Sequence, residues 1–109
     1  MPVTCDEYSG VSVITVKGDL GPTEATALRG MLVDRAKRPN LVIDLEACHF
    51  MASVGLEALL DALRLCEERT GRLMLAGLDA NCRRVLQITR LDHRFECHEG
   101  LASALKGMA

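Results

Sequence analysis

Two short, almost continuously apolar segments constrain the fold of this chain most. Residues 41–45 read LVIDL and residues 73–76 read LMLA, and a segment with helical spacing follows each of them. A strand that is apolar on both faces belongs inside a sheet that is covered on both sides, and such a sheet is usually parallel. We therefore expect a layered α/β structure in which these two strands lie inside the sheet.

Strand and helix signals alternate along the rest of the chain. Residues 2–8 and 11–17 are predicted strands joined by the Ser9-Gly10 turn. Helices are predicted over 22–38, 56–70, 80–89 and 101–108, and a short polar edge strand over 92–97. Pro39 ends the first of these helices, Gly71 ends the second, and Asp79 is the N-cap of the third. The order β-β-α-β-α-β-α-β-α predicts a mostly parallel sheet with an antiparallel N-terminal edge strand, in a single domain over residues 1–109.

Composition excludes several function classes. The chain has 13 basic and 15 acidic residues, which argues against a dedicated nucleic-acid-binding face. Since the sequence contains no long apolar run and does not start like a signal peptide, we expect no membrane span and no secretion. The five cysteines are odd in number and form no C-x-x-C pair, which is typical of reduced thiols in the cytoplasm. No phosphate-binding glycine motif occurs, so no cofactor is expected.

The segment 45–60, LEACHFMASVGLEALL, carries the most functional information. A buried strand ends at Leu45, and Ser53 lies at or beside the N-cap of the leucine-rich helix that follows. A serine there can accept hydrogen bonds from the first turn, and the helix N-terminus would stabilise a phosphate added to it. Gly55 has no Cβ and would let another backbone or a phosphate approach closely. Ser53 is therefore either an ordinary helix cap or a phosphorylation site.

The same segment resembles the STAS domain as found in bacterial anti-sigma factor antagonists. The pattern D-L-x4-F-x-x-S-x-G-L starts at Asp44, and Gly18-Asp19-Leu20 adds a weaker match ahead of the first helix. The resemblance covers nearly all of the chain and implies a STAS-like sheet in the order given above. It also implies a binding protein rather than an enzyme, acting in the regulation of sigma-factor-dependent transcription.

The resemblance implies a partner and a switch. In that family the antagonist binds an anti-sigma factor whose histidine-kinase-like ATPase domain is a serine kinase, and a metal-dependent serine phosphatase reverses the phosphorylation. By position, Ser53 matches the phosphorylated serine. The partner-binding residues are expected in two loops: Asp19, Leu20, Gly21, Thr23, Met51, Ala52, Ser53, Val54, Gly55 and Glu57. We expect Met51 and Val54 to be partly exposed, because a docking patch needs apolar anchors.

Three positions depart from the family pattern. Ala52 replaces the aspartate before the serine, Val54 replaces the small hydroxyl residue after it, and Gly21 replaces an aspartate in the first loop. Alanine cannot orient the serine hydroxyl as a carboxylate could. The alternative is therefore a STAS subunit that is not phosphorylated, such as the small component of a lipid-transport ATPase or another signalling complex.

The sequence contains partial matches to two further kinds of site. A serine hydrolase elbow requires G-x-S-x-G, but Met51 occupies the first glycine position. The pairs Cys48-His49 and Cys97-His98 could supply four metal ligands, but adjacent strand residues point to opposite faces. Neither a catalytic nor a metal site is therefore expected.

Overall fold

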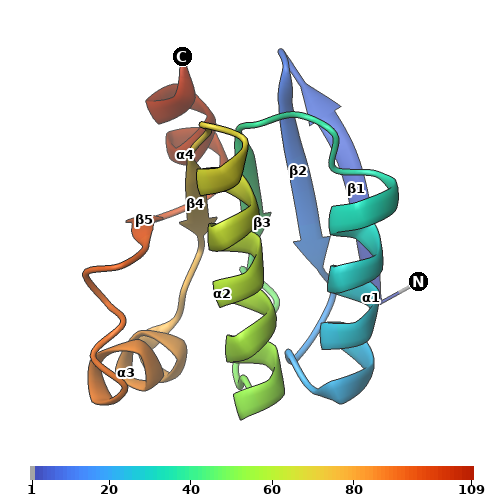
Figure 1. Cartoon of the computed structure of the whole chain (residues 1–109). Coiled ribbons are helices and arrows are strands. Elements are labelled where there is room, and N and C mark those ends of the chain that lie inside the picture. The colour runs from blue at the N-terminus through green and yellow to red at the C-terminus, as the bar shows by residue number, and fades with distance from the viewer. Residues whose placement is uncertain (1) are drawn as a thin grey trace.

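Residues 2–109 are described by a computed structural model, in which five strands form one sheet (Figure 1). The strands are β1 (Val3–Tyr8), β2 (Val11–Val16), β3 (Leu41–Asp44), β4 (Leu73–Ala76) and β5 (Glu96–His98). They lie in the order β1-β2-β3-β4-β5, with β1 antiparallel to β2 and all other neighbours parallel. The predicted α/β class, with a mostly parallel sheet and an antiparallel N-terminal edge strand, is confirmed.

Helices cover both faces of this sheet. They are α1 (Pro22–Asp34), α2 (Ser53–Glu68), α3 (Ala80–Ile88) and α4 (Leu101–Met108). In Figure 1, α1 and α2 run side by side over one face and α4 lies over the other. The larger core fills the space beneath α1, α2 and α3, where Leu28, Leu59 and Leu86 are buried. The smaller core lies beneath α4, where Ala104 meets Val42 and Met74.

Three predicted boundaries are wrong by more than two residues. Helix α1 ends at Asp34 instead of reaching residue 38, and the N–H groups of Arg35 and Ala36 both donate to the Met31 carbonyl as the chain leaves the helix. Proline also disfavours helical geometry in the residue before it, so the disruption begins ahead of Pro39. Helix α2 begins at Ser53 rather than after Gly55. Strand β5 covers only 96–98, because residues 92–95 form a turn.

Candidate functional site

Three loops meet where the parallel strands end. Residues 17–21 follow β2, residues 45–52 follow β3, and residues 77–79 follow β4, at the lower end of the molecule in Figure 1. Parallel strands bring their carboxyl ends to one edge of a sheet, and each loop here leads directly into a helix. The first two loops and the first turns of the helices that follow them carry the serine and the other residues that the sequence predicts as a partner-binding site.

Backbone hydrogen bonds join the first two loops. Leu20 and Met51 form a parallel β-bridge outside the main sheet. The Leu20 N–H donates to the Phe50 carbonyl at 2.9 Å, and the Ala52 N–H donates to the Leu20 carbonyl at 3.0 Å. The start of α1 and the start of α2 are therefore fixed relative to one another.

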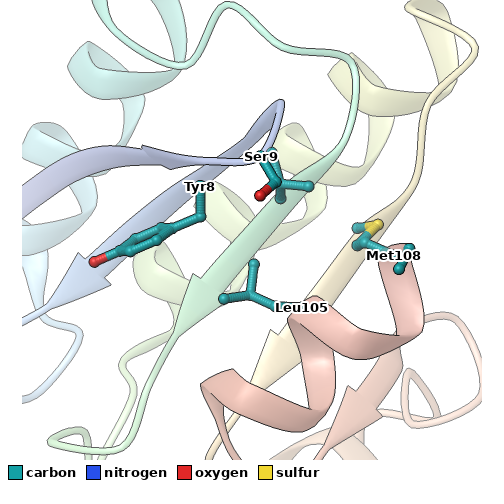
Figure 2. A pocket seen from close by; sticks show the side chains of 6 residues that line it. Tyr8, Ser9, Leu105 and Met108 are labelled. Carbon is teal, nitrogen blue, oxygen red and sulfur yellow. The ribbon is translucent and has the colours of Figure 1, made fainter.

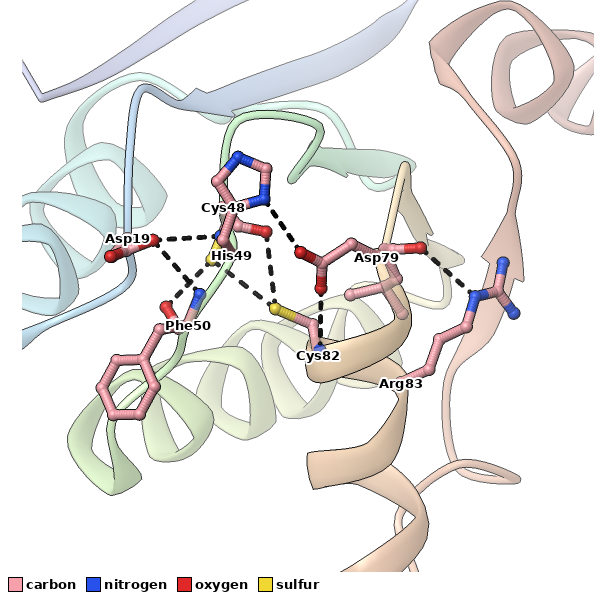
Figure 3. A network of polar contacts seen from close by, with 8 residues as sticks. Asp19, Cys48, His49, Phe50, Asp79, Cys82 and Arg83 are labelled. Carbon is pink, nitrogen blue, oxygen red and sulfur yellow. Dashed lines mark hydrogen bonds and ion pairs between the residues drawn. The ribbon is translucent and has the colours of Figure 1, made fainter.

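Asp19 adds a side-chain tie at the same place. Its Oδ1 atom accepts hydrogen bonds from the His49 N–H at 3.0 Å and the Phe50 N–H at 3.1 Å (Figure 3). One carboxylate oxygen thus satisfies two successive backbone donors of the second loop. Asp19, a predicted partner-binding residue, also has a structural role that its position in the sequence did not indicate.

Gly55 explains how closely the loops can approach. A Cβ atom at this position would lie 2.5 Å from the Leu20 carbonyl oxygen and 2.6 Å from Leu20 Cγ. The backbone that uses the space left by the missing side chain therefore belongs to the first loop of the same chain. The expectation that Gly55 leaves room for a phosphate is not supported, since Leu20 already occupies that room.

Ser53 is the first residue of α2 and is exposed. The N-cap is Ala52, whose methyl group offers no acceptor, so the prediction that the serine hydroxyl caps the helix is wrong. The N–H groups of the first helical turn and the positive end of the helix dipole still lie beside Ser53. A negative charge added to this hydroxyl would be stabilised there rather than repelled.

Two exposed apolar side chains flank the serine. Phe50 is 60% exposed and Val54 is 36% exposed, so the expectation for Val54 is confirmed. The prediction for Met51 is wrong, because Met51 is only 3% exposed and its strand-like bridge to Leu20 turns it into the core. Leu20 is likewise fully buried. Phe50 belongs to the sequence pattern that indicated the family, but the list of partner-binding residues omitted it.

The other expected residues lie at the starts of the two helices. Gly21 is the N-cap of α1, and its N–H donates to Glu24 Oε1 at 3.2 Å. Thr23 in the first turn of α1 and Glu57 in the second turn of α2 are both exposed. Thr23 and Glu57 are thus accessible to another protein, whereas Gly21 has a structural position as the N-cap of α1.

The third loop fastens the second from the other side. Asp79 is the N-cap of α3, as predicted, and its Oδ1 atom accepts from the Cys82 N–H at 2.9 Å. Its Oδ2 atom lies 2.9 Å from His49 Nδ1 (Figure 3). The Cys82 N–H and then the His49 ring hold the pKa of Asp79 below its usual value. The sequence predicted the N-cap but not the pairing with His49.

Hollows of about 170, 330 and 260 Å³ lie on the surface of residues 2–109, and Ser53 lines none of these. One of about 170 Å³ lies between the β1–β2 turn and α4, lined by Tyr8, Ser9, Leu105 and Met108 among others (Figure 2). Typical ligand pockets measure roughly 300–1,000 Å³. The hollow of about 330 Å³, between α1 and α2, is of this size, and Arg29, Leu32 and Asp61 are among the residues that line it. Within residues 2–109, no three His, Cys, Asp or Glu side chains come together as a metal site, and no helix of this part of the chain has the length and apolar composition to cross a membrane.

Known proteins are similar to this chain in sequence and in fold. A family model described as Mlab, STAS domain, matches residues 3–103. The anti-sigma-F factor antagonist RsfB of Mycobacterium tuberculosis is 32% identical over 97% of this chain and 88% of its own. The crystal structure of an anti-sigma factor antagonist from Mycobacterium paratuberculosis is 30% identical, covers 97% of this chain and 92% of its own, and superposes with a TM-score of 0.81.

A third protein is more distant in sequence but has the same fold. It is the Bacillus cell fate determinant SpoIIAA in its phosphorylated form, with 20% identity, a TM-score of 0.74, and coverage of 98% of this chain and 99% of its own. The element order, the mixed sheet and the family match over residues 3–103 agree with one another. The chain belongs to the STAS domain family.

Proposed function

We propose that this protein is an anti-sigma factor antagonist that docks its partner through the exposed side chains around the start of α2. We call this the docking surface and define it by Asp19, Thr23, Phe50, Ser53, Val54 and Glu57, all of which are exposed. One observation carries the proposal: an exposed serine begins a helix between two exposed apolar side chains on a loop that the chain itself holds in place. The names of the two mycobacterial relatives support the same role.

The size of a stable interface explains why the docking surface spans both loops. A standard protein–protein interface covers about 800 Å² on each partner. The solvent-accessible surface of the chain measures 5860 Å², so such an interface would take about one-seventh of it. Phe50 and Val54 alone are too small for this area. They would act as apolar anchors, with Asp19, Thr23 and Glu57 as the polar rim.

Ser53 is proposed as the switch within this surface. An anti-sigma factor with a serine kinase domain would transfer the γ-phosphoryl group of ATP to Ser53 Oγ, which loses its proton as ADP leaves. The helix N-terminus accommodates the phosphate, so the fold survives. The added charge of about −1.5 to −2 lies between Phe50 and Val54, where docking requires an apolar contact. A metal-dependent serine phosphatase would remove it, and the cycle would run in the bacterial cytoplasm.

A kinase assay with matched variants tests this proposal. The protein is incubated with the ATPase-domain anti-sigma factor of its own organism and ATP, and the phosphate is mapped by mass spectrometry. We expect it on Ser53 and expect Ser53→Ala to abolish it, whereas Ser103→Ala, which changes another exposed serine near a helix start, leaves it intact. Ser53→Asp should weaken binding at least tenfold, or about 1.4 kcal/mol, while Ser53→Ala binds as the wild type does. Phosphate on another residue would remove Ser53 from the mechanism.

One observation favours a second role. A polar side chain next to Ser53 could orient its hydroxyl toward a kinase. The two adjacent residues here, Ala52 and Val54, have no polar side chain. The chain would then be a STAS subunit that binds its partner permanently, for example in a lipid-transport ATPase. Binding to a partner with no phosphate transfer under the same conditions would select this role. A kinase gene and a phosphatase gene beside that of the protein would favour the first role, and permease genes the second.

A further inference from the structure

Two buried thiols face each other behind the docking surface. Cys48 Sγ lies 3.9 Å from Cys82 Sγ, and both residues are fully buried (Figure 3). Cys48 belongs to the loop between β3 and α2, and Cys82 belongs to the first turn of α3. We propose that Cys48 and Cys82 form a reversible disulfide under peroxide stress and that this bond reshapes the docking surface. The second half of this inference rests on the proposed function.

The geometry requires only a short movement. Sulfur atoms in a disulfide lie about 2.05 Å apart, so the two thiols must approach by roughly 2 Å. The backbone N–H of Cys82 is held by Asp79 Oδ1 at 2.9 Å, within a helix. Cys48 lies in a loop rather than in a helix, so we expect its side chain and the adjacent backbone to make most of the movement toward α3.

Both thiols now support the backbone of that loop. Cys48 Sγ donates to the Phe50 carbonyl at 3.2 Å, and Cys82 Sγ donates to the Cys48 carbonyl at 3.5 Å. A disulfide has no S–H group, so both carbonyls lose these donors when the bond forms. Phe50 is the residue whose ring is 60% exposed in the docking surface. Oxidation of the thiol pair thus removes one backbone contact of an apolar anchor of that surface, while the Leu20 N–H still donates to the Phe50 carbonyl.

The chemistry balances with hydrogen peroxide as oxidant. One thiol loses its proton and attacks a peroxide oxygen, the O–O bond breaks, and a sulfenic acid and water result. The second thiol attacks the sulfenic sulfur, the S–S bond forms, and the S–O bond breaks to release a second water. The two sulfurs lose two electrons in total and the peroxide gains them. A dithiol reductant reverses the reaction by thiol–disulfide exchange.

Burial sets the conditions for this reaction. It raises the pKa of Cys48 and raises that of Cys82 further, so both remain protonated in the resting protein. The residues on either side of Cys48, Ala47 and His49, are exposed, so Cys48 lies close to the surface of the protein although it is buried. Hydrogen peroxide is small and uncharged and can enter when this loop opens locally. The pair therefore responds to sustained oxidation rather than to a brief pulse.

The test uses the whole protein and needs no partner. The folded chain is treated with hydrogen peroxide, free thiols are alkylated after denaturation, and peptides are mapped by mass spectrometry. We expect a loss of two hydrogen atoms, a peptide that links Cys48 to Cys82, and full reversal by dithiothreitol. Cys66→Ala changes another buried thiol and should keep the link, whereas Cys82→Ala should abolish it. Free Cys48 and Cys82 after prolonged exposure to peroxide, long past the point at which the partly exposed Cys5 and Cys97 are oxidised, would overturn the inference.

A fluorescence probe tests the effect on the docking surface. The chain has no tryptophan, so Phe50→Trp places a single reporter at the exposed anchor. Oxidation should shift the emission of this variant reversibly, and Phe50→Trp combined with Cys82→Ala should show no shift. A disulfide that forms without a shift would overturn the control of docking. Neither measurement uses a kinase or a sigma-factor pathway, so failure of this inference can be distinguished from failure of the proposed function.

Discussion

The two ends of α2 use the same packing device with different results. At the start of the helix, Gly55 lets the Leu20 carbonyl approach where a Cβ would lie only 2.5 Å away. Just past its end, Gly71 lets the Pro39 carbonyl approach so closely that a Cβ would overlap with it. Each contact joins α2 to the segment that precedes or follows α1. Both ends are therefore fixed by a backbone that passes over a glycine.

The two ends differ in what surrounds the contact. Near the second one, Arg69 donates to the Ala36 carbonyl, and Arg72 pairs with Glu96 at 2.9 Å and donates to the Gly107 carbonyl at 3.1 Å. The chain thus covers this end with its own polar groups. At the start of α2, Phe50 and Val54 remain exposed beside Ser53. The docking surface is therefore well ordered, and it combines two exposed apolar side chains with an exposed serine at a helix start.

Substitution of Gly71 should break the covered end. In Gly71→Ala the new methyl group must displace the Pro39 backbone, because no flexible side chain can yield in its place. We expect a loss of about 3 kcal/mol in the free energy of unfolding, measured with urea, and unchanged partner binding by the folded fraction. Gly30→Ala is the control: nothing lies within 4 Å of its Cβ inside α1, so it should stabilise the protein by about 0.5–1 kcal/mol. Equal effects of the two variants would refute the packing argument.

Substitution of Gly55 should affect both stability and docking. Gly55→Ala pushes on Leu20, but the better helix propensity of alanine offsets part of the cost, so we expect a net loss of about 1–2 kcal/mol. Leu20 holds the loop that bears Phe50, and we therefore also expect weaker partner binding, measured by calorimetry at a temperature where the variant is folded. Normal binding by Gly55→Ala would mean that the docking surface tolerates a shift of the two loops.

The sequence predicted those features that depend on local residue pattern. The apolar runs at 41–45 and 73–76 identified two inner strands, and Asp79 identified the start of α3. The position of Ser53 was predicted to within one residue of the N-cap. In each of these cases a few adjacent residues contain the whole signal, and tertiary contacts reinforce it.

Features that depend on a distant segment could not be predicted in this way. Met51 is buried and Phe50 exposed because Leu20 pairs with Met51 as in a sheet, and nothing near Met51 in the sequence indicates that bridge. The pairing of His49 with Asp79 has the same origin. The sequence predicts Gly71 only as a helix stop, whereas the structure shows that Gly71 also gives room to the Pro39 backbone. A single sequence does not show which segments meet.

Acid should weaken both ends of α2, each through its own carboxylate. At the docking end, the Cys82 N–H and the His49 ring lower the pKa of Asp79. At the covered end, partial burial acts to raise the pKa of Glu96, but Arg72 and then His98 bring it below its ordinary value. A carboxylate with a folded-state pKa below its unfolded-state value stabilises the fold above the unfolded pKa, about 4, and loses this contribution as the pH falls through the folded pKa.

We therefore expect the urea concentration at the unfolding midpoint of the wild type to decrease as the pH is lowered from about 5 to about 2. The urea midpoints of Asp79→Asn and Glu96→Gln should each decrease less steeply over this range, and that of the double variant less steeply still. Ser53 phosphorylation, measured at pH 7, should respond to Asp79→Asn and not to Glu96→Gln, since only Asp79 supports the loop before Ser53. Parallel pH curves for all four proteins would show that these carboxylates contribute nothing specific.

The smallest effect should come from the turn that ends α2. Thr70 has a φ of 58°, and its N–H and that of Gly71 donate to the carbonyls of Glu67 and Cys66 at 3.1 and 2.8 Å, which forms a Schellman motif. Glycine normally takes the left-handed position, but here Pro39 requires the glycine one residue later. Thr70→Gly should therefore stabilise the protein by about 0.5–1 kcal/mol in urea unfolding, because relief of the β-branched residue outweighs the added freedom of the unfolded chain. Partner binding should stay unchanged. A loss of stability would mean that the free-energy cost of the strain at Thr70 is smaller than the entropic cost of adding a glycine to the unfolded chain. The stability of the covered end would then come from the Pro39 contact and not from the turn.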